Sequence, residues 1–216
     1  MIPMATLWIR TVPGLLLTAI AGLALMNASG NSVLGSEAKE ASMPTEQAFL
    51  IDDFSAPGGI SALGTRWRFF SDRVMGGLSD GVSGLETVAG RRCLRLRGRV
   101  SLENNGGFIQ VALPLLQGGR PLDASGFKGV RAWVRGNANT YHIHLRTSQS
   151  MRPWQYFSAA FDATADWRQV DLPFERFQPE NLRARLDRRG LVRIAIVAIG
   201  KQFEAEVAVS RLEFYR

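Results

Sequence analysis

Alternation of apolar and polar residues with a period of two is the feature of this sequence that most constrains its fold. The clearest alternating runs are residues 129–136, 140–148, 153–161, 167–174, 192–200 and 206–215, and earlier runs are residues 49–54, 66–72, 92–98 and 107–115. The clearest runs are rich in β-branched or aromatic residues, and most are bounded by Gly, Pro, Asn or Asp, as strands are. About ten such strands predict an all-β fold, an antiparallel β-sandwich or jelly roll. Residues 179–189 are the exception, because their pattern favours a turn of helix.

The chain is expected to divide into a leader, a linker and a folded domain. Arg10 is the only charged residue before Glu37, and the apolar run at residues 12–26 suits a signal peptide better than a membrane span. We expect a signal peptide at residues 1–28, a flexible linker at 29–48 and a β-sandwich domain at 49–216. The protein is then exported, to the periplasm or the extracellular space. The alternatives are a mitochondrial transit peptide and an uncleaved leader, which would be the only contact with a membrane.

Charge limits the classes of partner. The net charge is +7 and comes mainly from arginine, since Lys39, Lys128 and Lys201 are the only lysines. This balance favours anionic groups on lipids, glycans or protein surfaces. Nucleic acid is not expected as a partner of an exported chain that has no run of five basic residues. Cys93 is the only cysteine, so stability must come from the core and not from an intrachain disulfide.

A glycine-rich segment, residues 71–84 with the sequence SDRVMGGLSDGVSG, interrupts the strand pattern. Its glycines predict a tightly shaped loop between strands, with at least one of Gly76 and Gly77 at positive φ. Loops of this kind often carry binding sites. We expect Arg73, which lies between Asp72 and Val74, to pair bidentately with a carboxylate and so lock the loop, and Met75 either to plug the sandwich or to project into a partner. The candidate contact residues of the loop are Asp72, Arg73, Met75, Gly76, Gly77 and Ser79.

Two patterns that resemble catalytic motifs do not support an enzyme. Residues 77–81 match the Gly-x-Ser-x-Gly motif of serine hydrolases, with Ser79 at its centre. That motif needs a helix after the serine, whereas the residues that follow have no helical period. Asp52 and Asp53 are adjacent, so in a strand they point to opposite faces and cannot act as an acid–base pair. The sequence therefore predicts a domain that is not an enzyme and has no cofactor.

The two histidines of the chain lie in one run, where His142, His144 and Arg146 share a face. A metal site is not expected there. A catalytic zinc ion needs a third protein ligand, which no neighbouring pattern supplies, and Arg146 would repel a cation.

The preceding run has a similar face, on which Trp133 lies between two arginines. If the two strands pair with these faces aligned, arginines, imidazoles and an indole form one open surface, which Trp154 and Tyr156 extend. Such a surface is typical of β-sandwiches that bind sugars or anionic groups. The alternative is that the aromatic side chains belong to the core and the arginines to the solvated surface.

Taken together, these motifs resemble those of the complex I intermediate-associated protein 30 family. The matching segments are IDDF (51–54), WRFFSDRVMGGLSDG (67–81), ENNGGFIQV (103–111), GVRAWVRGN (129–137), Tyr141 in TYHIHLRTS, YFSAAF (156–161), and Trp167 through VDLPFERFQP (170–179). The resemblance implies a galactose-binding-like β-sandwich, related in shape to carbohydrate-binding modules, with a non-enzymatic role. Eukaryotic members are assembly factors for respiratory complex I, whereas an exported domain would lie away from the peripheral arm of that complex.

Two function classes therefore stay open. One is a non-catalytic binding or assembly module that recognises a protein partner through the loop at residues 71–84. The other is an exported carbohydrate-binding module that uses the face of Trp133, His142, His144 and Arg146.

Overall fold

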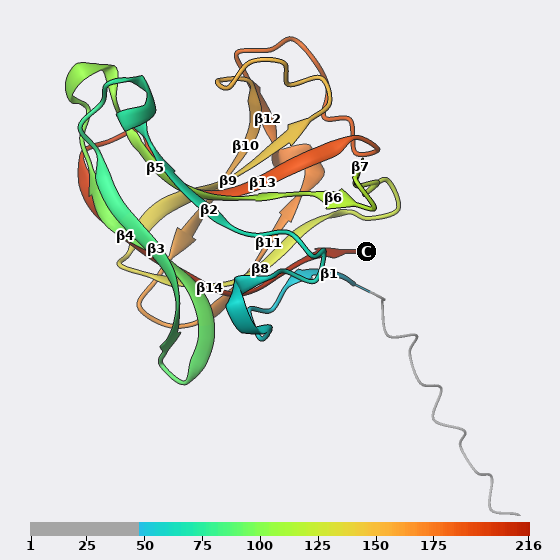
Figure 1. Cartoon of the computed structure of the whole chain (residues 1–216), viewed down its shortest axis with the longest axis horizontal. Helices are drawn as coiled ribbons and strands as arrows, with labels where there is room; N and C mark the ends of the chain where they lie inside the picture. The colour runs from blue at the N-terminus through green and yellow to red at the C-terminus, as the bar shows by residue number, and fades with distance from the viewer. Residues whose placement is uncertain (1–47) are drawn as a thin grey trace, which may run out of the picture. The chain divides into compact units, whose positions relative to one another are not determined.

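Alternating strands build two antiparallel sheets that pack face to face in the computed structural model, which describes residues 48–216 (Figure 1). Sheet 1 contains, in spatial order, β11 (Arg168–Pro173), β8 (Gly129–Gly136), β14 (Phe203–Tyr215), β4 (Arg91–Val100) and β3 (Asp80–Val88), with β1 (Phe49–Asp52) paired to β14. Sheet 2 contains β12 (Gln178–Glu180), β10 (Tyr156–Ala163), β9 (Asn139–Thr147), β13 (Leu191–Ile199), β5 (Phe108–Pro114) and β2 (Arg68–Ser71). A small hairpin joins β6 (Leu116–Gln117) to β7 (Arg120–Pro121).

The predicted all-β sandwich is confirmed. In the described part of the chain the helical elements are short 3-10 turns, namely η1 (Pro57–Gly59), η2 (Asp72–Met75), η3 (Glu103–Asn105) and η4 (Phe174–Arg176). No helix within residues 48–216 is long and apolar enough to cross a membrane. The predicted signal peptide at residues 1–28 and the linker up to residue 47 lie outside the described residues.

The inner faces of the two sheets form the core, as the alternation predicts. Tyr141, Ile143 and Leu145 on β9 are fully buried together with the inward side chains of β8. The hydroxyl of Tyr141 donates to Asn137 Oδ1 at 2.6 Å and accepts the backbone N–H of Glu206 at 2.8 Å. Burial raises the pKa of Tyr141 to about 12. The largest buried side chain therefore joins the two sheets without leaving its polar atom unpaired.

Residues 129–136 do not pair with residues 140–148, so the condition for one shared polar surface is not met. β8 pairs with β11 and β14 in sheet 1, whereas β9 pairs with β10 and β13 in sheet 2. The chain crosses between the sheets at Ala138, which has a φ of 60°. Because the apolar faces of both strands line the same core, their polar faces point to opposite sides of the sandwich.

Two expectations are wrong. The glycine-rich segment is not a loop throughout, since β3 begins at Asp80 and includes two of its glycines. A Cβ on Gly81 would approach the carbonyl oxygen of Arg97 to 2.6 Å, so this glycine allows β3 and β4 to pack closely. Residues 181–190 form no helix. Leu182, Ala184 and Leu186 pack half-buried against the core at every second position, which is the period of an extended chain.

Candidate binding site

The loop after β2 is built around the buried carboxylate of Asp72. This carboxylate accepts the backbone N–H groups of Gly107 at 2.6 Å, Ser79 at 2.9 Å and Phe108 at 3.2 Å, and the Ser79 hydroxyl also donates to it. Burial alone would raise the pKa of Asp72, but these hydrogen bonds outweigh it and hold the pKa below its usual value. A charged Asp72 therefore ties η2 to the starts of β3 and β5.

Two glycines next to this carboxylate have different structural roles. Gly76 has a φ of 90° and ends η2 by donating its N–H to the carbonyl of Arg73 at 3.2 Å, which confirms the predicted positive φ. A Cβ on Gly77 would overlap the side chain of Asp72. Gly76 thus allows the turn, and Gly77 leaves room for the carboxylate.

Arg73 does not form the predicted bidentate pair with a carboxylate. Asp72 points inward and is satisfied by backbone N–H groups, whereas Arg73 points outward with its Nη2 3.8 Å from Asp80 Oδ1. The hydroxyl of Ser79 is fully buried, donates to Asp72 and accepts the N–H of Ser101 at 2.9 Å. Ser79 is therefore a structural residue, and its hydroxyl is not available as a nucleophile.

The other half of η2 is exposed. Val74 and Met75 are 74% and 60% exposed, although both are apolar. Met75 therefore does not plug the sandwich. It projects from a turn that the Asp72 carboxylate fixes, and we call Val74 and Met75 the η2 rim.

The outer face of sheet 2 brings His142, His144 and Arg146 together, as the alternation predicts. The ring of His144 stacks on that of Tyr156, with centroids 4.0 Å apart and planes 12° apart. Burial, and secondarily the neighbouring His142, lower the pKa of His144 to about 3. His144 is therefore neutral at physiological pH and serves as a packing surface for Tyr156.

A groove of about 580 Å³ lies over this face. Its floor comes from β2, β5, β9 and β13, and its walls come from the η2 rim on one side and from β10 with the preceding loop on the other. The lining residues are Phe70, Val74, Met75, Phe108, Gln110, His144, Arg146, Pro153, Trp154, Tyr156, Arg193, Ala195, Val197 and Ile199. This volume is within the range of small-ligand pockets, and the lining is mostly apolar. Figure 1 shows the segments that form the two walls, namely the turn that follows β2 and the loop that precedes β10.

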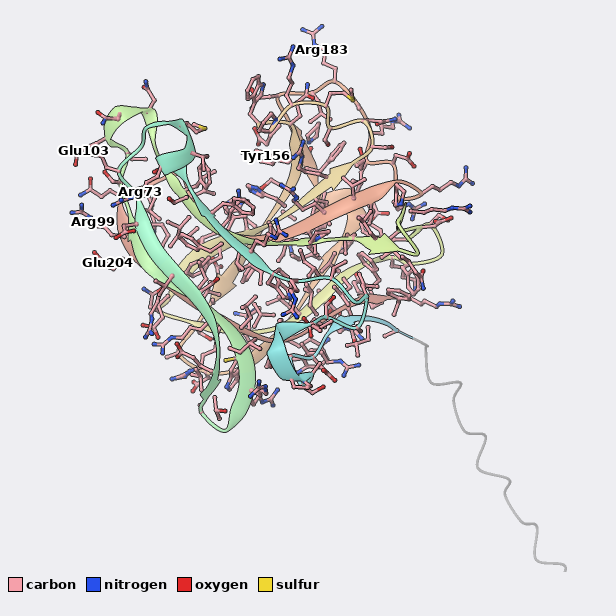
Figure 2. All side chains as sticks on the ribbon, in the orientation of Figure 1. Arg73, Arg99, Glu103, Tyr156, Arg183 and Glu204 are labelled. Carbon is pink, nitrogen blue, oxygen red and sulfur yellow. The ribbon has the colours of Figure 1, made fainter. Side chains whose placement is uncertain are left out.

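The second wall, residues 148–155, is held in place by hydrogen bonds, and we call it the β9–β10 rim. Arg146 Nη2 donates to the carbonyl oxygens of Ser150 at 2.7 Å and Arg152 at 3.0 Å. Asn181 Nδ2 donates to the carbonyl of Trp154 at 3.3 Å, and the Trp154 side chain is 53% exposed. Figure 2 labels Tyr156 near the start of β10 and Arg73 to its left, beside the turn that follows β2.

Trp133 does not join this surface. It lies half-buried on β8 in sheet 1, opposite Gln169 of β11 and Arg211 of β14. Of the predicted site residues, Met75, His144 and Arg146 line the groove. His142 lies on the same outer face of sheet 2, beside the groove, and its Nδ1 is 2.9 Å from the hydroxyl oxygen of Ser158. The remaining loop residues shape the η2 rim or, like Arg73, lie outside the groove.

Within residues 48–216 no group of three or more His, Cys, Asp or Glu side chains is arranged to hold a metal ion. The ring centroids of His142 and His144 are 6.0 Å apart. The groove therefore offers ring and aliphatic surfaces with arginine donors as its chemistry.

Residues 53–205, more than half of the chain, match the family model described as complex I intermediate-associated protein 30. The chain belongs to this family. No curated protein matches the chain significantly. The matched range includes the segment with Asp72 and Gly77 that builds the η2 rim.

Solved structures similar to this family member include carbohydrate-binding modules. The family 11 module of cellulase Lic26A-Cel5E of Clostridium thermocellum matches with a TM-score of 0.61 and 12% identity, covering 79% of this chain and 95% of the module. The same type of module in complex with a β-1,3-1,4-mixed-linked tetrasaccharide matches with a TM-score of 0.60 and 13% identity, covering 78% and 95%. A family 30 module matches with a TM-score of 0.51 and 15% identity, covering 68% and 82%. At such low identities the likeness shows the fold alone.

Sequence reasoning missed the floor of the groove, including Phe70, Phe108, Arg193 and Val197. The available signal was the nearly continuous apolar run of β13, LVRIAIVAI. A strand that is apolar on both faces indicates a second apolar surface besides the core, and here that surface is the floor of the groove.

Proposed function

We propose that this domain is a non-catalytic binding module that holds an apolar segment of a protein partner in the groove. The observation that carries the proposal is the combination of exposed Val74, Met75 and Trp154 around a floor of aliphatic and aromatic side chains. Met, Trp, Tyr and Arg are enriched in protein interfaces, whereas apolar aliphatic side chains offer little to sugar hydroxyls. Both rims are fixed by hydrogen bonds, so little conformational entropy is lost on binding.

The role we propose is therefore that of an assembly factor or a holding module, in line with the family. If the protein is exported, as the apolar leader favours, its partner would be an envelope or extracellular protein.

Site-specific photo-crosslinking tests the proposal in the native cell. Full-length protein carries benzoylphenylalanine in place of Trp154 or, as a control, in place of Val82, which is 56% exposed on β3. We expect the groove position to crosslink to an extended apolar peptide of a partner, identified by mass spectrometry, and the β3 position not to. Met75→Asp should abolish this crosslink. Met75→Ala should change the free energy of unfolding by no more than about 0.5 kcal/mol, because the side chain is 60% exposed. Equal crosslinking from both positions, or crosslinking unaffected by Met75→Asp, would refute the proposal.

Carbohydrate binding is the second candidate, favoured by the exposed indole of Trp154 beside Tyr156. Affinity electrophoresis of the full-length protein through gels that contain soluble β-glucans tests it. Retardation that is lost in Trp154→Ala would support a glycan ligand and contradict the protein-partner proposal. Equal mobility with and without glycan removes this candidate.

A further inference from the structure

Two arginines of the groove face each other without a carboxylate. Arg146 on β9 and Arg193 on β13 are directly opposite in the register of sheet 2, and both side chains are half-buried. Like charges in this position destabilise a sheet. Burial, and secondarily the charge of Arg193, lower the pKa of Arg146, although a guanidinium stays protonated at any physiological pH.

Neither guanidinium has a counter-ion in the part of the chain that the structure describes. Arg146 donates only to backbone carbonyls, and its buried Nε has no hydrogen-bond partner. The guanidinium carbon of Arg193 lies 5.8 Å from the ring centroid of Phe70, across the groove floor. Two positive charges are thus held beside an apolar surface with no negative charge to balance them.

Two half-buried arginines of sheet 1 show the opposite arrangement. Arg131 forms two hydrogen bonds to the carboxylate of Asp171, at 2.8 and 2.9 Å. Arg95 Nη1 lies 2.9 Å from Glu86 Oε2, and its Nη2 lies 2.7 Å from Glu206 Oε1. These two half-buried arginines therefore have acidic partners, whereas the half-buried arginine pair of the groove has none within the described residues.

One carboxylate affects the groove face from its edge. Glu180 on β12 is opposite Tyr156. Burial lowers the pKa of His142 and raises that of Tyr156, and the charge of Glu180 acts to raise both pKa values. It is not among the groups that shift the pKa of Arg146. The cationic end of the groove therefore remains uncompensated.

We propose that the partner segment carries a carboxylate next to its apolar side chains, and that Arg146 and Arg193 bind this carboxylate. This inference rests on the proposed function, since it names the chemistry of the segment that the groove holds. Apolar side chains would lie on Phe108, Ala195 and Val197, while a carboxylate would neutralise the two guanidinium groups. A charge-assisted contact of this kind is stronger in a half-buried groove than in open water. The carboxylate belongs to an Asp or Glu side chain or to the C-terminus of the partner.

Peptide selection tests the inference on the full-length protein. Random peptides displayed on phage are selected, and the enriched sequences are synthesised with each acidic residue intact or changed to its amide, and with a free or amidated C-terminus. Dissociation constants come from fluorescence anisotropy. We expect each enriched peptide to need one carboxylate, whose amidation weakens binding roughly tenfold or more. The position of the sensitive group distinguishes a side chain from a C-terminus.

Arg193→Gln supplies the decisive comparison, because Arg146 also supports the β9–β10 rim. In this variant the acid and amide peptides should bind within about twofold of each other, while the melting temperature stays equal to or above that of the wild type. Arg99→Gln, at an exposed position of β4 labelled in Figure 2, is the matched control and should keep the preference for the acid.

The outcomes separate this inference from the proposed function. Peptides that bind in a Met75-dependent manner without preferring a carboxylate, or whose preference survives Arg193→Gln, refute the inference and leave the proposed function standing. Failure to enrich any Met75-dependent peptide refutes both. Binding of an acidic polysaccharide such as alginate, lost in Arg193→Gln while no peptide binds, also overturns the peptide assignment.

Discussion

Replacing Asp72 by Asn removes one charge from the turn that forms the η2 rim, and we expect a large loss of stability. The carboxylate accepts three backbone N–H groups and one hydroxyl, and its side chain is fully buried. An amide keeps the shape but places an NH2 group against these donors. A net hydrogen bond to a charged group contributes about 1.5–3 kcal/mol, so loss of one or two gives a destabilisation of roughly 1.5–6 kcal/mol. This is a large part of the 5–15 kcal/mol typical of a folded domain.

Urea denaturation followed by tryptophan fluorescence measures this effect, with Asp80→Asn as the matched control. Asp80 is in the same segment, but its side chain is 71% exposed and its contact with Arg73 is 3.8 Å long. The control should therefore stay within about 0.5 kcal/mol of the wild type. If Asp72→Asn also stays within that range at pH 7, the carboxylate does not organise the turn and our account of the η2 rim is wrong.

Acid titration gives an independent check of the same residue. Because the folded-state pKa of Asp72 is lowered, its charge contributes stability above the ordinary carboxyl pKa of about 4, and this contribution is lost as the pH falls through the folded-state value. The stability difference between wild type and Asp72→Asn should therefore be constant from pH 7 to about pH 5 and shrink below about pH 4. A difference that grows on acidification would contradict the lowered pKa.

Further predictions concern the turn, the groove face and the leader. Gly77→Ala should lower the melting temperature, because its Cβ would overlap Asp72, whereas Gly84→Ala, with no atom within 4 Å of the added Cβ, should not. His144 is neutral when folded, with a pKa of about 3, so unfolding takes up a proton below the ordinary pKa of about 6.5. Stability should therefore fall between pH 6.5 and 4, and His144→Gln should flatten this slope in urea titrations. Mass spectrometry of the mature protein should find the leader removed near Ala28, and an intact Met1 in soluble protein would contradict export. Elemental analysis after dialysis should find no stoichiometric zinc.

The fold could be predicted from the sequence because alternation is a local property. The strand formed by residues 129–136 was predicted with its observed bounds, since small and aliphatic residues at every second position alternate with Arg131, Trp133 and Arg135. β3 was missed because its glycines, which allow close packing against β4, also resemble those of a loop. Residues 181–190 were misassigned because charged residues between Leu182, Ala184 and Leu186 resemble a helical surface, although the burial has a period of two.

The site could be predicted only in part, because it depends on which faces the sheets present to solvent. Alternation placed His144 and Arg146 on one face, and the loop motif identified Met75. Alternation cannot tell which sheet a strand joins, so Trp133 was placed with residues that lie on the other side of the sandwich. The groove also needs Phe70 and Val197 from strands far apart in the sequence, and only the sheet order β9-β13-β5-β2 brings them together.

The η2 turn links the stability of the domain to its binding surface. Asp72 points inward and Met75 points outward from the same turn, so the buried carboxylate fixes the position of the exposed thioether. A rim fixed in this way presents Met75 without the entropy loss of ordering a mobile loop. Any Asp72→Asn protein that remains folded should therefore bind the acidic apolar peptides more weakly, although Asp72 does not line the groove. Equal affinity of the folded variant and the wild type would show that peptide binding in the groove does not depend on this turn. The β9–β10 rim would then bind the peptide without the η2 rim.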